Sequence, residues 1–577
     1  MGASRYVEQN DGYKEEVVMF GTNQLNQSHW TQRVSLASVV ALLALVLALA
    51  LPTAAPAQGK GKGLKGLVDL GEPHFSPART PAHEDIPKGG IGRNFRLLDH
   101  NPLIQTGGTL PRGGGGNEIA IVRNCAYAAS KNNDQGVMIL DISDPRNMRV
   151  VREMEPLPNA PSGNSVTSDH LIAVESENLL VQFSENNSAP WDGNFAELFD
   201  TTDCFNPVKV GRIDLPDTPH DPNMLWQGGN PHRVLMFLTF NTRRGMANPP
   251  PPADVDLRIY DITVKSNPIG PIAEYSFQRV FQIPVRETPP FFENAGFNRR
   301  NAIHAINVSN DHLSSQGFPT RIYTATYGIG WPILDSTPLA ERLAGGPACD
   351  VDSAGPNPCI KKLNPLLRQG NMSKEPPFNQ SSHHSAVKVP NRPYMMVSDE
   401  PGQCPWSWLR FAYIGDEEDG VEVSGQKLRG DIFPGQVGSF RIPENREEDC
   451  AANRAKFAHD VSGDESFNAH LHLVFENIMF TSWNNAGLRA IDISDPGMPF
   501  ETGFYFPPPV PGGVTAAGDD HPNLSLNSVP TLKDGVIYVM DRVNGVYSFE
   551  YTGPRSDEVP KEGLFQQQQT QVVGRQP

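Results

Sequence analysis

The chain has 577 residues, of which 48 are Lys or Arg and 65 are Asp or Glu, so its formal net charge at pH 7 is −17. This balance argues against nucleic acid as a partner, because nucleic-acid binders present a basic face that displaces counterions. It also argues against docking on anionic lipid. The 52 glycines and 53 prolines indicate a turn-rich chain, and long amphipathic patterns are scarce, which disfavours helical bundles and coiled coils.

Residues 1–57 have the pattern of a targeting segment. A run at 34–51 that is apolar except for Ser35 and Ser38 follows Arg33, and Ala55-Pro56-Ala57 is a small-x-small site, so we expect a secretory signal peptide cleaved after Ala57. Because such a run is also just long enough to span a membrane, a retained N-terminal anchor is the alternative. The residues before Met19 are too acidic for an ordinary signal peptide, which makes Met19 an alternative start. The sequence therefore predicts a secreted or extracytoplasmic protein, periplasmic or at the cell surface, that meets a membrane only if 34–51 is retained.

The six cysteines include no C-x-x-C pair, which disfavours a zinc ribbon or a thioredoxin-like site. An even number of cysteines in an exported chain indicates disulfides. Cys349 and Cys359 flank a short loop and are the best-placed pair. Cys404 with Cys450 is a second, less constrained candidate pair.

Residues 58–116 form a Gly/Pro-rich linker, in which the stretch near Gly66–Phe75 is a candidate closing strand. Beyond it an internal repeat is visible, since GVMILDISDP at 136–145 is matched by GLRAIDISDP at 487–496. Weaker copies occur at 196–215 and 256–275. In each unit a strand ends in a turn whose Asp and Ser side chains can bond nearby backbone N–H groups and whose Pro presets φ. The simplest role for the repeated aspartates is therefore in the turn itself, and these are Asp141, Asp144, Asp492 and Asp495.

Four short strands per repeat, separated by turns, is the pattern of a β-propeller blade. We therefore expect an all-β fold, a β-propeller of about seven four-stranded blades with long insertions, in one domain at 117–553. Six or eight blades remain alternatives, and residues 554–577 are expected to be a disordered tail. The expected blades lie near 117–156, 163–215, 220–284, 302–345, 384–443, 468–507 and 524–553.

The two DISDP segments resemble the repeat of the LVIVD-repeat family of secreted β-propeller proteins, and the resemblance extends over about 117–553. It implies an extracytoplasmic propeller, often associated with a surface, and says little about chemistry. A more distant likeness is to the selenium-binding protein and methanethiol oxidase family. Those proteins are also propellers, with histidines that bind copper, and no long motif of that family is present here.

Four histidines each lie near the start of an expected blade, where the innermost strand would line a central channel. Equivalent positions of successive blades form a ring, so these imidazoles could coordinate Cu or Zn. His472 is two residues after the last of them and is a further candidate ligand, whereas His383 should point to the opposite face. The alternative is structural, because a repeated histidine can bond the backbone of a neighbouring blade. The four candidate ligands are His220, His304, His384 and His470.

The leading functional hypothesis is a non-enzymatic extracytoplasmic binding or scaffold protein, with a protein or glycan partner on one propeller face. The first alternative is a metal-dependent, copper-type oxidoreductase with the central-channel histidine site. The second is a propeller hydrolase, for which Asp399 and Glu400 are candidate paired carboxylates. No G-x-S-x-G or H-E-x-x-H motif is present. The acidic segment 416–419 is expected to be a solvated loop rather than a Ca²⁺ site.

Overall fold

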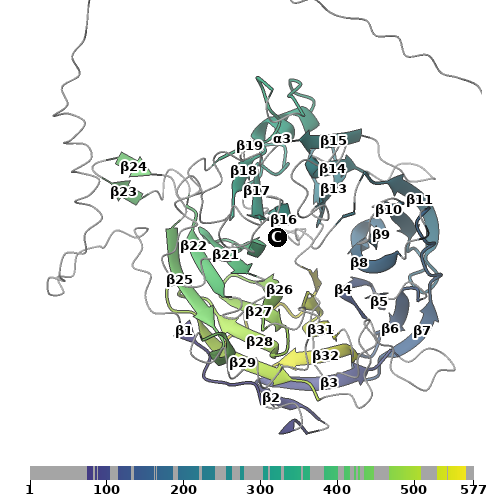
Figure 1. The fold of residues 1–577 in the computed structure, drawn as a ribbon, viewed down its shortest axis with the longest axis vertical. Helices are drawn as coiled ribbons and strands as arrows, with labels where there is room; N and C mark the ends of the chain where they lie inside the picture. Colours follow the sequence, from purple (N-terminus) through teal and green to yellow (C-terminus); the bar gives the residue numbers. More distant parts are fainter. Residues whose placement is uncertain are drawn as a thin grey trace, which may run out of the picture. The chain divides into compact units, whose positions relative to one another are not determined.

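The computed structural model describes residues 74–566 with gaps, of which the longest are 104–114, 241–254, 279–302, 364–382, 447–466 and 509–528. Within this part of the chain the strands form seven four-stranded antiparallel blades that follow one another around a ring (Figure 1). The all-β propeller expected from the sequence is confirmed, and so is the count of seven.

The blades follow the chain order, each running from an inner strand to an outer strand. Blade one consists of β4 (Gly115–Val122), β5 (Cys125–Ser130), β6 (Met138–Asp141) and β7 (Arg149–Glu153). Blade two consists of β8 (Thr167–Val174), β9 (Leu179–Glu185), β10 (Phe195–Asp200) and β11 (Val208–Asp214). Blade three consists of β12 (Met224–Gly228), β13 (Arg233–Thr239), β14 (Val255–Asp261) and β15 (Ala273–Gln278). Blade four consists of β16 (Ile303–Val308), β17 (Arg321–Thr326), β18 (Ile333–Asp335) and β19 (Lys361–Lys362).

The last three blades continue the same order. Blade five consists of β20 (His383–Lys388), β21 (Tyr394–Asp399), β22 (Leu409–Tyr413) and β25 (Gly435–Arg441). Blade six consists of β26 (Ala469–Val474), β27 (Ile478–Trp483), β28 (Gly487–Asp492) and β29 (Phe500–Phe506). Blade seven consists of β30 (Thr531–Lys533), β31 (Val536–Asp541), β32 (Gly545–Tyr551) and β3 (Phe95–Asn101).

A few short elements decorate the blades. The helix α3 (Thr337–Leu343) and the 3-10 turns η2 (Glu175–Glu177) and η5 (Pro443–Asn445) lie in connections, and β23 (Val421–Val423) pairs with β24 (Gln426–Leu428) as a separate hairpin. The strand β33 (Leu564–Phe565) pairs with β30. No helix among the described residues is both long and apolar enough to cross a membrane. The expected signal peptide or anchor at 1–57 lies outside the described residues.

The hydrophobic core lies between the blades. Side chains alternate along a strand, so each strand faces both of its neighbouring blades. In β21, for example, Met396 packs in a cluster with Met479 of blade six, whereas Met395 and Val397 pack in another with Tyr323 of blade four. The blades therefore hold one another, and the ring must be closed for its last interface to be buried.

The N-terminal segment closes the ring and covers three outer edges, which we call the strap (residues 74–101). The strand that completes blade seven is β3, which pairs antiparallel with β32 and lies within the expected segment 58–116. Of the candidate stretch near Gly66–Phe75, residues 66–73 lie outside the described residues. The stretch ends in β1 (His74–Phe75), which extends the outer edge of blade five parallel to β25. The strand β2 (Ile91–Arg93) likewise extends blade six beside β29. Figure 1 shows these purple strands beside the green and yellow blades.

Two disulfides are present in the described part of the chain. Cys349 and Cys359 are bonded, as the sequence predicted. Cys125 and Cys204 form the other bond, which joins the second strand of blade one to a turn of blade two. The predicted pairing of Cys404 with Cys450 lies outside the described residues.

Candidate functional site

The two ends of the propeller differ. At one end, which we call the turn face, lie the connections from the inner strand to the second strand and from the third strand to the outer strand. The DISDP turns belong to this face. At the other end, the entry face, each inner strand begins. Long connections such as 279–302, 364–382 and 447–466 lead into inner strands there.

The turn face is held by the repeated aspartates. Asp141 Oδ1 accepts a hydrogen bond from the Ser143 N–H at 3.0 Å, and Asp492 Oδ1 accepts one from the Ser494 N–H at 2.8 Å. The weaker repeat copies this bond, since Asp200 Oδ1 accepts from the Thr202 N–H at 2.7 Å. The second aspartates of the DISDP turns do the same, Asp144 toward Arg146 and Asp495 toward Gly497. The repeated aspartates are therefore turn residues, as their sequence context predicted.

These bonds also favour the ionised form of Asp141 and Asp200. The hydroxyl and N–H of Ser143 lower the pKa of Asp141, and those of Thr202 lower the pKa of Asp200. Arg149 adds an ion pair to Asp141 at 2.8 Å. In blades one, two and six the turn face is thus built from turns whose aspartates bond their own backbone.

Three of the predicted histidines come together near the entry face, in a set that we call the histidine row. They occupy the starts of the inner strands of blades four, five and six, and they are His304, His384 and His470. The ring centroids of His304 and His384 are 4.2 Å apart, and those of His384 and His470 are 4.5 Å apart. The fourth predicted ligand, His220, lies outside the described residues.

A repeated irregularity of the backbone positions the row. The pairing of each inner strand with its neighbour shifts register at the histidine, between Ile303 and Ala305 in β16 and between His383 and Ser385 in β20. In β26 the shift falls between Ala469 and His472. A β-bulge re-aims the side chain that it carries, so the same bulge in three blades brings the three rings to equivalent places.

Side chains of neighbouring blades contact the backbone carbonyls at the bulges, where the regular strand pairing is interrupted. Thr239 Oγ1 donates to the carbonyl of His304 at 3.0 Å. His304 Nδ1 lies 3.0 Å from the carbonyl of His384, and Ser385 Oγ donates to the carbonyl of His470 at 3.3 Å. Because a carbonyl only accepts, His304 must carry its proton on Nδ1, which leaves the lone pair of the neutral ring on Nε2. This is the structural role that the sequence left open as the alternative, and it is realised for His304.

The row is buried rather than exposed along an open channel. The exposed fractions of His304, His384 and His470 are 0%, 1% and 4%. Among the described residues no group of three His, Cys, Asp or Glu side chains is arranged to hold a metal ion. The tilted, closely packed rings account for this, because imidazoles that share one ion direct their nitrogen lone pairs at a common point.

His472 has a different role from that proposed for it. Its Nδ1 is 2.7 Å from Thr481 Oγ1 and its Nε2 is 2.9 Å from Ser398 Oγ, so both ring nitrogens contact hydroxyls. Burial lowers the pKa of His472 well below its ordinary value, and the nearby His384 adds to this effect. His472 is a neutral bridge between blades five and six.

The predicted carboxylate Asp399 is paired as well. Its Oδ1 lies 2.7 Å from His383 Nδ1, and its Oδ2 is bound by the Arg410 guanidinium. Burial would raise the pKa of Asp399, but Arg410 and His383 outweigh burial and hold it below its ordinary value. Asp399 is therefore a fixed anion, while Glu400 and the acidic segment 416–419 lie outside the described residues.

Comparison with known proteins identifies the repeats. The LVIVD repeat model matches residues 113–154 and 474–506, which cover blade one and the outer three strands of blade six. The chain is a β-propeller that contains LVIVD repeats. Both DISDP turns of this LVIVD propeller fall within the matched segments. A search of curated protein sequences found no match.

Solved structures similar to the LVIVD propeller share little sequence with it. The β-propeller domain of Cps50 (Swd1) from Myceliophteria thermophila is 12% identical, with a TM-score of 0.38 over 79% of this chain and 98% of that one. Sqt1 from Saccharomyces cerevisiae is 7% identical, with a TM-score of 0.41 over 77% and 97%. A functionally unknown protein from Desulfotomaculum acetoxidans is 11% identical, with a TM-score of 0.33 over 68% and 84%. The fold assignment depends on the strand pairing of the chain itself.

Proposed function

We propose that the protein is an exported binding protein that takes its ligand, a protein or a glycan, on the entry face over the histidine row. The observation that carries this proposal is the gathering of three histidines from successive blades at one end of the propeller. His304, His384 and His470 occupy the entry-face starts of three successive inner strands, with Asp399 and Arg410 nearby in blade five. In the sequence, long connections precede the inner strands of blades four, five and six, and loops on a rigid scaffold are where binding residues gather.

Two features support export. Disulfides persist in oxidising compartments and are rare in the cytosol, and the described part of the chain holds two. The apolar run at 34–51, followed by a small-x-small site, also supports secretion. N-terminal sequencing of the exported protein would test this part. A mature terminus at residue 58 supports cleavage, and an intact run at 34–51 supports an anchor.

The binding proposal is tested by ligand-induced stabilisation of the full chain against panels of oligosaccharides and peptides. A ligand at 100 times its Kd stabilises the folded state by about 2.7 kcal/mol. A ligand of the entry face should stabilise the wild type and H232Q but not H384Q. His232 is the matched control because it lies in a turn-face connection, where its Nε2 contacts Glu177 at 2.8 Å. A ligand that stabilises H384Q as well as the wild type would place binding elsewhere and refute the proposal.

A transition-metal ion at the histidine row is the second candidate, and the specific observation that favours it is the packing of three imidazoles from successive blades. The Nδ1–H of His304 is committed to a carbonyl, and this arrangement leaves Nε2 as the ligand atom, as in many metal-bound histidines. The three rings as packed are not arranged around one point, so they would hold the ion only after turning toward it. His220, the fourth predicted ligand, lies outside the described residues. Imidazole donors suit Cu or Zn, and copper would supply redox chemistry.

Elemental mass spectrometry of the full chain, purified without chelator or affinity histidines, tests the metal candidate. The expected result is about one Cu or Zn per chain in the wild type and in H232Q, and loss of that metal in H384Q. Absence of metal above trace after incubation with Cu and Zn would refute the metal site while leaving the binding proposal in place.

A further inference from the structure

A second buried cluster lies at the junction of blades one and two, whereas the histidine row lies in blades four to six. His170 Nδ1 is 3.6 Å from Glu118 Oε1, and His170 Nε2 is 3.3 Å from Glu185 Oε2. The exposed fractions of Glu118, His170 and Glu185 are 1%, 0% and 3%. The three residues belong to β4, β8 and β9, so the contacts cross from one blade to the next.

The same cluster holds the backbone of the junction. Glu118 Oε2 accepts a hydrogen bond from the Leu171 N–H at 2.6 Å, so a side chain of blade one occupies a backbone donor of the inner strand of blade two. Beside it, Ser130 at the end of β5 pairs with Ser168 at the start of β8, which joins the two blades into one sheet. Opening the Glu118 contact would therefore loosen the start of β8, at the entry face.

A count of protons shows what the cluster requires. A neutral imidazole has one N–H, yet both ring nitrogens of His170 face carboxylate oxygens. With both glutamates ionised and the ring neutral, two negative charges would lie within 4 Å of one fully buried ring. Burial disfavours such a net charge, so an added proton, on the ring or on a carboxyl group, is favoured. In both cases the cluster holds one proton more than a neutral imidazole and two carboxylates.

We propose that Glu118, His170 and Glu185 form a protonation-dependent latch that ties blade one to blade two and loosens the entry face when its proton is lost. Titratable groups that contact the ring include Glu118 from β4 and Glu185 from β9. Ser168 on the strand of His170 itself and Gln182 on β9 are uncharged, and Gln182 Nε2 donates to Ser168 Oγ at 2.7 Å.

The sign of the pH effect follows from the proton count. The folded junction binds a proton that a free imidazole, with an ordinary pKa of about 6.5, gives up near neutral pH. The latch is therefore closed in mildly acidic solution, and its contribution is lost as the pH rises through the titration of the cluster. Loss of one proton changes the opening equilibrium by at most about tenfold per pH unit.

Amide hydrogen exchange of β8 in the full chain, with the Leu171 N–H as the reporter, tests the latch between pH 5.5 and 8.5. After correction for the intrinsic exchange rate, wild-type protection should fall with rising pH, at most about tenfold per unit. H170Q should lack this fall. E185Q should stay protected at every pH, because its amide N–H can face a neutral ring without an added proton. H232Q, which alters a His–Glu pair of the turn face, should behave as the wild type.

Two results would overturn the latch. The first is wild-type protection of β8 that does not change with pH. The second is the same pH dependence in E185Q as in the wild type, which would assign the proton to another group. E185Q keeps the imidazole and the shape of the carboxylate, so it remains informative even if H170Q does not fold.

Discussion

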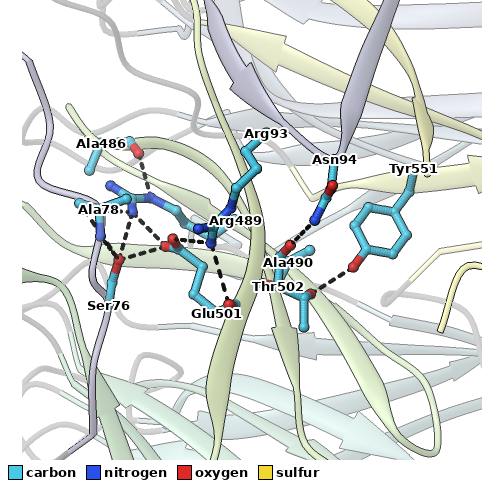
Figure 2. Close-up of polar contacts among 10 residues, drawn as sticks. All are labelled: Ser76, Ala78, Arg93, Asn94, Ala486, Arg489, Ala490, Glu501, Thr502 and Tyr551. Atoms are coloured by element: carbon cyan, nitrogen blue, oxygen red, sulfur yellow. Dashed lines mark hydrogen bonds and ion pairs between the residues drawn. The ribbon is translucent and has the colours of Figure 1, made fainter. Parts of the chain in front are cut away.

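Replacement of Arg489 by Met tests how the strap is held against blades five and six. The side chains of Arg489 on β28 and Glu501 on β29 are both fully buried, and Nη1 of Arg489 lies 2.6 Å from Glu501 Oε2. Arg489 Nε donates to the carbonyl of Ala486 at 2.9 Å, and Nη1 also reaches Ser76 Oγ at 3.3 Å and the Ala78 carbonyl at 3.2 Å. Figure 2 shows this guanidinium between the strap and the blade.

The expected cost of R489M is about 3–5 kcal/mol, because removing one partner of a buried ion pair leaves the other charge uncompensated. R489K keeps the charge but loses the planar fork, and about two hydrogen bonds at about 1 kcal/mol each give a cost of about 2 kcal/mol. The double variant R489M/E501L should recover part of the loss, since it also removes the buried Glu501 carboxylate, whose other ion-pair partner, Arg93, is 45% exposed. The matched control is R96M, because the ion pair of Arg96 with Glu550 is largely exposed and should contribute about 0–1 kcal/mol.

Urea unfolding followed by tryptophan fluorescence measures these costs, and trypsin cleavage after Arg79 reports release of the strap. R489M should unfold at lower urea concentration and be cleaved faster at Arg79, while R96M should match the wild type in both assays. A cost below 1 kcal/mol for R489M, or a double variant as unstable as R489M, would refute the argument that this buried pair anchors the strap.

Two further predictions concern the disulfides and the turns. Replacing Cys204 by Ser opens a loop of 79 residues closed by Cys125 and should cost about 4.5 kcal/mol, whereas replacing Cys359 by Ser opens a loop of 10 residues closed by Cys349 and should cost about 2.7 kcal/mol. Thermal unfolding of the two variants checks this order, and an equal loss would contradict the loop-closure argument. D141A should cost about 1 kcal/mol at neutral pH through its lost turn bonds. Because the folded-state pKa of Asp141 is lowered, this cost is present above the ordinary value of 3.8 and should vanish as the pH falls through the folded-state value, which unfolding at a series of acidic pH values measures.

The blades could be predicted from the sequence because their signal is local. A DISDP turn is specified by Asp and Ser side chains that bond backbone groups two residues away, so its pattern lies within ten residues. Even the weak copy at 196–215 forms the same Asp200 turn. The expected blade near 163–215 accordingly matches β8 to β11, which run from Thr167 to Asp214.

The strap and the second disulfide could not be predicted in this way, because their partners are distant in the sequence. The strand β3 pairs with β32 across more than four hundred residues, and β1 joins blade five in parallel, with no turn to mark either pairing. Cys125 and Cys204 are likewise brought together only by the packing of blade one on blade two. The neighbouring sequence contains no feature that distinguishes these strand and cysteine pairs from other possible pairs.

The buried residues of the entry face differ in the same way, because some follow a local sequence pattern and others depend on distant partners. His304, His384 and His470 stood out in the sequence because they recur at one place in successive blades, and the bulges of the inner strands bring them together. Glu118, His170 and Glu185 were not singled out in the sequence, although His170 lies four residues before the end of its inner strand, as His470 does. Their pairing depends on a glutamate from one blade reaching the backbone of the next.

The difference between the two ends of the propeller follows from these constraints. At the turn face the aspartates are bonded within their own turns. Replacing one of them therefore destabilises its turn, whether or not a ligand is bound. At the entry face the buried imidazoles and carboxylates are bonded between blades, so their protonation and pairing depend on how the blades meet. A ligand or a proton that acts on the blade junctions therefore acts through the entry face, which is why both the binding proposal and the latch lie at that end.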